Sequence, residues 1–75
     1  MSIPKELLTA AEEARRRLAA GDPKGTIHIG EQILRHMPKF AGVHALLARA
    51  YRQTGEADKA LARFRSAAEL SPGDP

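Results

Sequence analysis

The stretch AGVHALLARAYRQTGEADKALARFRSAAELSP, residues 41–72, decides the fold. Apolar residues recur in it at spacings of three and four, which place them on one face of a helix. The run Thr54-Gly55-Glu56 interrupts this pattern as a tight turn, and Pro72 prevents the second helix from continuing. The stretch therefore predicts two helices, over residues 40–53 and 57–70, which pack antiparallel because their connection is short.

The first half of the chain repeats this organisation. Four kinds of residue recur at an offset of 34 positions: Gly21 and Gly55, Pro38 and Pro72, Ala14 and Ala48, and Arg15 and Arg49. Asp22-Pro23 is a typical helix start, and the breakers predict helices over residues 4–20 and 23–36. A fixed period with two helices per unit is a repeat architecture. We therefore predict an all-α single domain over residues 1–75, with units at about 7–38 and 41–72 and a frayed tail at 73–75.

The second unit resembles a tetratricopeptide repeat. That family's pattern has a tryptophan-like residue, leucine, a small residue and tyrosine on the first helix, then alanine, phenylalanine and alanine on the second, then proline. The corresponding residues here are His44, Leu47, Ala48, Tyr51, Ala60, Phe64, Ala67 and Pro72, with Gly55 in the turn between the two helices. Only His44 departs, and we expect it to pack in the tryptophan position. The resemblance implies two stacked helical hairpins in a short right-handed α-solenoid, with Leu47, Tyr51 and Phe64 filling the space around the helix crossing.

The first unit is a degenerate copy of this pattern. Its departures are Glu13 for leucine, Arg17 for tyrosine, Thr26 for alanine, Gly30 for phenylalanine and Ile33 for the last alanine. Terminal repeats are often atypical because one face meets water. We therefore interpret this unit as an N-terminal cap, in which Glu13 and Arg17 form a solvent-facing pair.

The resemblance also implies a function. Repeats of this family bind partner peptides in a concave groove lined by the first helix of each unit. Carried over to this chain, the groove residues are Leu8, Ala11, Arg15, Leu18, Gly42, Ala45, Arg49, Arg52 and Gln53. Arg15 and Arg49 are equivalent and should lie side by side, and a guanidinium group can hold a carboxylate through two hydrogen bonds. This predicts an acidic peptide or a C-terminal carboxylate as ligand, and the alternative is that the arginines are simply solvated.

The lysine and asparagine clamp of chaperone-binding members is absent, because Ala11, Arg15, Ala45 and Arg49 occupy its positions. A chaperone C-terminus is therefore not the predicted ligand.

The outer side of the last predicted helix suggests self-association. Leu61, Ala68 and Leu70 would stay exposed there, and an uncovered apolar face favours a partner. Three outcomes remain open: the chain is part of a longer protein, it forms a homo-oligomer, or a partner's helix covers the face. The alternative function is thus an assembly element, or an N-terminal accessory module of a larger protein or enzyme.

Other functions find little support. Twelve basic and nine acidic residues give a net charge of +3, spread evenly, and three aromatic residues offer little for stacking on nucleic acid. The chain has no cysteine, and His28, His36 and His44 are too widely spaced for a metal site. No catalytic constellation, phosphate loop, membrane span or signal peptide is evident. We expect a cytoplasmic, non-enzymatic protein without metal or cofactor.

Overall fold

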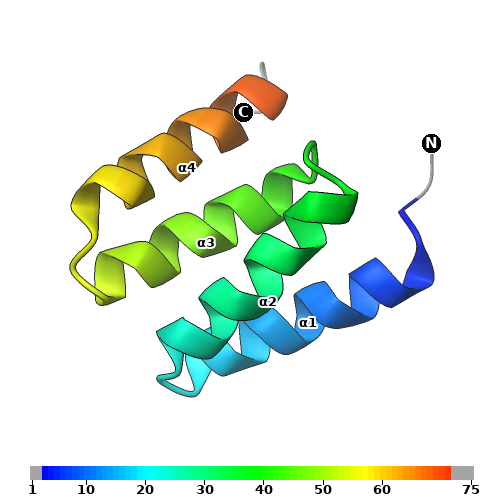
Figure 1. The fold of residues 1–75 in the computed structure, drawn as a ribbon, viewed down its shortest axis with the longest axis horizontal. Helices are drawn as coiled ribbons and strands as arrows, with labels where there is room; N and C mark the ends of the chain where they lie inside the picture. The colour runs from blue at the N-terminus through cyan, green and yellow to red at the C-terminus, as the bar shows by residue number, and fades with distance from the viewer. Residues whose placement is uncertain (1–2, 72–75) are drawn as a thin grey trace.

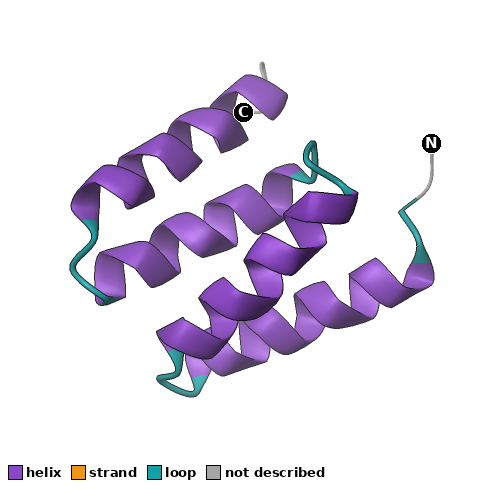
Figure 2. Ribbon diagram, viewed as in Figure 1, coloured by secondary structure: helices purple, strands orange, loops and turns teal. Residues whose placement is uncertain are grey.

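A computed structural model describes residues 3–71 of the chain. It contains four helices: α1 (Lys5–Ala19), α2 (Pro23–His36), α3 (Ala41–Gln53) and α4 (Ala57–Leu70) (Figure 1). The described residues are helices and loops without a strand, as Figure 2 shows. Each helix begins and ends within one residue of its predicted bounds. The predicted stop at Pro72 and the tail at 73–75 lie outside the described residues.

The helices pack as consecutive pairs. α1 packs on α2 and α3 packs on α4, so each pair is an antiparallel hairpin (Figure 1). The two hairpins meet mainly through α2 and α3, and α1 approaches α3 at fewer residues. The backbone of α4 approaches α3 alone. This arrangement confirms the all-α prediction of two stacked hairpins.

The two hairpin turns have the same hydrogen bonds, 34 residues apart. Gly21 and Gly55 adopt φ angles of 84° and 82°, which glycine reaches without steric cost. In the first turn the Asp22 amide donates to the Arg17 carbonyl at 2.8 Å, and the equivalent bond in the second turn is 2.9 Å long. This is the Schellman motif, which satisfies the last carbonyl groups of a helix. Both turns therefore reverse the chain with the same geometry.

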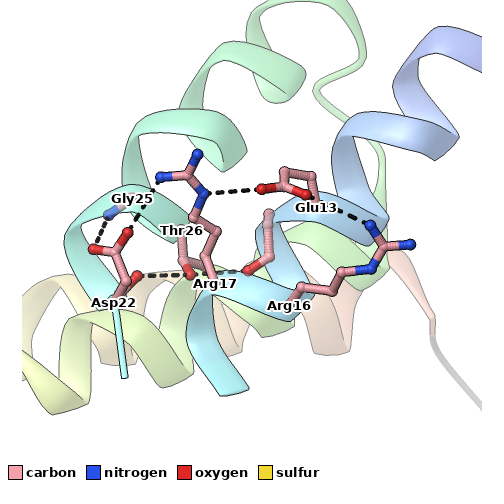
Figure 3. A network of polar contacts seen from close by, with 7 residues as sticks. Glu13, Arg16, Arg17, Asp22, Gly25 and Thr26 are labelled. Atoms are coloured by element: carbon pink, nitrogen blue, oxygen red, sulfur yellow. Dashed lines mark hydrogen bonds and ion pairs between the residues drawn. The ribbon is translucent and has the colours of Figure 1, made fainter. Parts of the chain in front are cut away.

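Polar side chains fix the first turn (Figure 3). The Asp22 carboxylate caps α2 by accepting from the Gly25 amide at 3.0 Å, as the sequence predicted. The Arg17 guanidinium joins Glu13, at 3.0 Å, to Asp22, at 3.3 Å. The hydrogen bond from Gly25 and the pairing with Arg17 hold the pKa of Asp22 below its usual value. The predicted Glu13–Arg17 pair is thus confirmed, on the exposed surface of α1 and its turn.

Thr26 joins the two helices of the first hairpin. Its side chain is fully buried, and its hydroxyl donates to the Ala14 carbonyl at 2.9 Å. The residue stands where the repeat pattern has alanine, at the crossing of α1 and α2. A small side chain fits this crossing, and the hydrogen bond removes the cost of burying its hydroxyl. Thr26 is therefore a structural substitute for the alanine rather than a loss of the pattern.

Gly30 lets the two hairpins approach closely. A Cβ atom at position 30 would lie 2.7 Å from Leu47 Cδ2 and 2.9 Å from Leu47 Cγ. Leu47 is fully buried at this point and has little room to move. The core around this contact consists of Ile33, Leu34, Val43, Leu47, Tyr51 and Ala60. The absent phenylalanine of the first unit is therefore replaced by a leucine reaching across from α3.

The prediction for Phe64 is wrong. Phe64 is 38% exposed rather than enclosed, and Ala60 is the one buried residue of α4. Leu61 is 51% exposed, Ala68 is exposed, and Leu70 is half-buried. The reason is positional: within residues 3–71 no helix follows α4 to cover the side that carries Phe64. The family pattern describes a repeat with neighbours on both sides.

We predict opposite effects for alanine at two glycines of the helices. Gly30→Ala gains about 1 kcal/mol of helix propensity but forces a Cβ into Leu47, an overpacking that costs about 1–3 kcal/mol. The expected net loss is about 1 kcal/mol of unfolding free energy. Gly42→Ala, where a Cβ meets the Phe40 ring at an ordinary 3.6 Å, should gain about 0.5 kcal/mol. Urea denaturation of both variants measures this, and a stabilised Gly30→Ala chain would contradict the close approach.

Candidate functional site

An open hollow of about 600 Å³ lies between the C-terminal part of α1, from Arg15 onward, and the part of α3 from Leu46 onward. These are the first helices of the two hairpins, where the groove was predicted. The lining residues are Arg15, Leu18, Ala19, Leu46, Arg49, Arg52 and Gln53. The structure thus brings together five of the nine predicted groove residues from two helices.

The other four predicted residues do not line this hollow. Leu8 is 46% exposed and Gly42 is exposed, whereas Ala11 and Ala45 are half-buried. All four belong to the N-terminal halves of α1 and α3 and precede the hollow along their helices, Ala11 by four positions and Ala45 by one. The hollow is therefore shorter than the predicted groove.

Sequence reasoning missed two lining residues, Ala19 and Leu46. Ala19 follows Arg15 by four positions and Leu46 precedes Arg49 by three, so each shares a helix face with a predicted residue. This spacing is the signal that could have found them. Together with Leu18 they make the apolar part of the lining.

The charge of the hollow is positive. Its lining holds three arginines and no acidic residue. The Arg15 guanidinium hydrogen-bonds to both Glu12 oxygens, at 3.0 and 3.3 Å, on the solvent-exposed surface of α1. These hydrogen bonds, with the opposite charges, lower the pKa of Glu12 and raise that of Arg15. Among the described residues, Arg49 and Arg52 form no ion pair.

A second polar cluster, centred on Glu31, joins α2, α3 and α4. The Tyr51 hydroxyl donates to Glu31 Oε2 at 2.5 Å, and Arg63 Nη2 donates to Glu31 Oε1 at 2.6 Å. Arg63 therefore extends the contacts of α4 beyond α3 to α2. Glu31 and Arg63 were not singled out from the sequence. A buried tyrosine hydroxyl requires a hydrogen-bond partner, and this requirement is the signal that could have pointed to a polar residue such as Glu31 near Tyr51.

His44 completes the Glu31 cluster. It is 5% exposed and occupies the tryptophan position, so its predicted packing role is confirmed. Its Nε2 lies 2.8 Å from the Pro38 carbonyl oxygen, and its Nδ1 lies 3.3 Å from Arg63 Nη1. A carbonyl only accepts and a guanidinium only donates, so Nε2 carries the proton and Nδ1 accepts. The ring thus fixes the α2–α3 turn and orients Arg63.

Burial and the neighbouring Glu31 carboxylate raise the pKa of Tyr51 to about 12. Partial burial acts to raise the pKa of Glu31, but the hydrogen bonds from Tyr51 and Arg63 and the charge of Arg63 outweigh it and lower that pKa. Near neutral pH the tyrosine is therefore protonated and the glutamate ionised, the forms that the hydrogen bonds need.

Within residues 3–71, no group of three histidine, cysteine or acidic residues could hold a metal ion. In the same residues, no helix has the length and hydropathy to cross a membrane.

The four helices define a helical-repeat module of two stacked hairpins. A family model described as tetratricopeptide repeat matches residues 17–75, from the last turn of α1 onward. The chain belongs to the tetratricopeptide-repeat family. The comparison with curated proteins gave no match, and neither did the comparison with solved structures.

We predict that the pKa of Tyr51, the single tyrosine of the chain, depends on its contact with Glu31. Because its folded pKa is about 12 and its unfolded pKa about 10, Tyr51 contributes stability that is present below pH 10 and lost as pH rises toward 12. The chain has no tryptophan, so tyrosinate absorbance follows Tyr51 directly. Glu31→Gln should lower the titration midpoint toward that of free tyrosine. Glu69→Gln, an exposed change on α4, should leave it in place, and equal midpoints in all three chains would refute the coupling.

Proposed function

We propose that this chain is a non-catalytic interaction module that binds an acidic peptide of a partner protein in the hollow between α1 and α3. The family implies a role in protein–protein interaction. The observation that supports the finer proposal is that Arg15, Arg49 and Arg52 line one hollow whose lining has no acidic residue.

The lining combines charge with apolar contact area. Leu18, Ala19 and Leu46 offer apolar surface to a ligand's side chains, and the guanidinium groups face the same space. Guanidinium groups bind carboxylates with directional, paired hydrogen bonds. A peptide with a glutamate, an aspartate or a free C-terminus therefore complements this surface better than a neutral or basic one.

Arg15 can take part despite its bond to Glu12. Both side chains are more than half exposed, so water screens their attraction. A ligand carboxylate can replace Glu12 without leaving a buried charge. Arg49 and Arg52, which have no acidic partner among the described residues, need no such exchange.

The same lining argues for binding without catalysis. Arginine, leucine, alanine and glutamine supply no nucleophile and no group that exchanges a proton near neutral pH. The hollow is also open to water, whereas catalytic sites exclude it.

Arg49→Glu should weaken binding of a glutamate-rich peptide with a free C-terminus by tenfold or more, since a charge-assisted hydrogen bond contributes about 1.5–3 kcal/mol. Fluorescence anisotropy of the labelled peptide measures the dissociation constant. The matched control is Arg35→Glu, an equal charge change at an exposed position of α2 outside the hollow. Equal affinities for the Arg49 variant and the unmodified chain would exclude this hollow as the binding site.

A further inference from the structure

α4 carries an exposed apolar stripe. Ala57, Leu61, Phe64 and Ala68 follow one another at spacings of four, three and four, so they lie along one side of the helix. All four are exposed, with Leu61 at 51% and Phe64 at 38%. Figure 1 shows α4 at the edge of the molecule, with α3 on one side of it. This seam of α4, defined by the four residues, has no helix over it within residues 3–71.

The equivalent side of α2 is covered by a helix. Shifted by the 34-residue period, Leu61, Phe64 and Ala68 correspond to Ile27, Gly30 and Leu34. Those three residues pack into the core, and Gly30 receives Leu47 of α3. The seam of α4 therefore corresponds to the side of α2 that, in the first hairpin, is covered by another helix.

The seam is complementary to itself. In an antiparallel pair of α4 helices centred between positions 62 and 63, Leu61 of each copy faces Phe64 of the other, and Ala57 faces Ala68. Large residues thus meet at the centre and small residues meet at both ends. A two-fold axis requires this symmetric pairing of one patch with itself.

The charges beside the seam fit the same register. Asp58 and Arg65 are exposed residues that follow Ala57 and Phe64, on the side of α4 away from the α3 contact. Neither forms an ion pair within residues 3–71. In the antiparallel pair, Asp58 of each copy lies beside Arg65 of the other, which gives two oppositely charged pairs.

We infer that two copies of this chain associate through antiparallel contact of their α4 seams, with Asp58 and Arg65 setting the register. The dimer is independent of the peptide hollow, which α1 and α3 line. A contact formed by one helix from each copy is at the small end of protein interfaces, so we expect a weak, reversible dimer.

Sedimentation equilibrium of the 75-residue chain, from micromolar to millimolar concentration, tests this. The expected result is a reversible change from 8.1 kDa to twice that mass, with no growth beyond it. Phe64→Glu should hold the chain at the monomer mass across the range, and circular dichroism should show its helices intact. Lys5→Glu, a change on exposed α1 surface, should dimerise like the unmodified chain.

A charge-exchange experiment tests the register. Asp58→Arg places like positive charges across the seam, and Arg65→Asp places like negative ones, so each variant alone should associate at least tenfold more weakly. Mixed in equal amounts, the two variants restore opposite charges at both pairs and should form a heterodimer with near-original affinity. Failure of the mixture to associate, growth into larger oligomers, or a monomer at millimolar concentration would each overturn the inference.

Discussion

The contact between Gly30 and Leu47 sets how the two hairpins lie together. Because Gly30 has no Cβ atom, the fully buried side chain of Leu47 on α3 can reach the backbone of α2. Each hairpin is already fixed by its own turn, and both turns have the same hydrogen bonds. One close contact between rigid hairpins therefore determines where α1 and α3 lie relative to each other, and with them the arginines of the hollow.

Arginine side chains have different surroundings in two parts of the chain. Near α2 and α4, Arg63 is two-thirds or more buried, and its hydrogen bonds go to Glu31 and His44. In the hollow, Arg49 and Arg52 have no acidic partner among the described residues. A guanidinium that is satisfied within the protein holds helices together, whereas one facing an open hollow is available to a ligand. The proposed function depends on this difference.

The sequence predicts the helices well because glycine, proline and capping residues act locally. It also places Arg15 and Arg49 at equivalent positions of the two units, 34 residues apart, and both line the same hollow. It fails where the outcome depends on neighbours in space: Phe64 is exposed because its side of α4 is uncovered, and Gly30 is buried because Leu47 reaches it. The Glu31–Arg63 pair spans 32 positions and does not match the 34-residue offset, so the repeat period did not indicate it.

The most direct test of the stacked hairpins is the nuclear Overhauser effect between the Gly30 α protons and the Leu47 methyl protons in the full chain. Stacking predicts a strong effect, because the space at Gly30 is filled by the end of the Leu47 side chain. Absence of that effect, with the Leu47 methyl groups contacting only α3 and α4, would show two hairpins that do not stack as described, and the shared hollow between α1 and α3 would then have no basis.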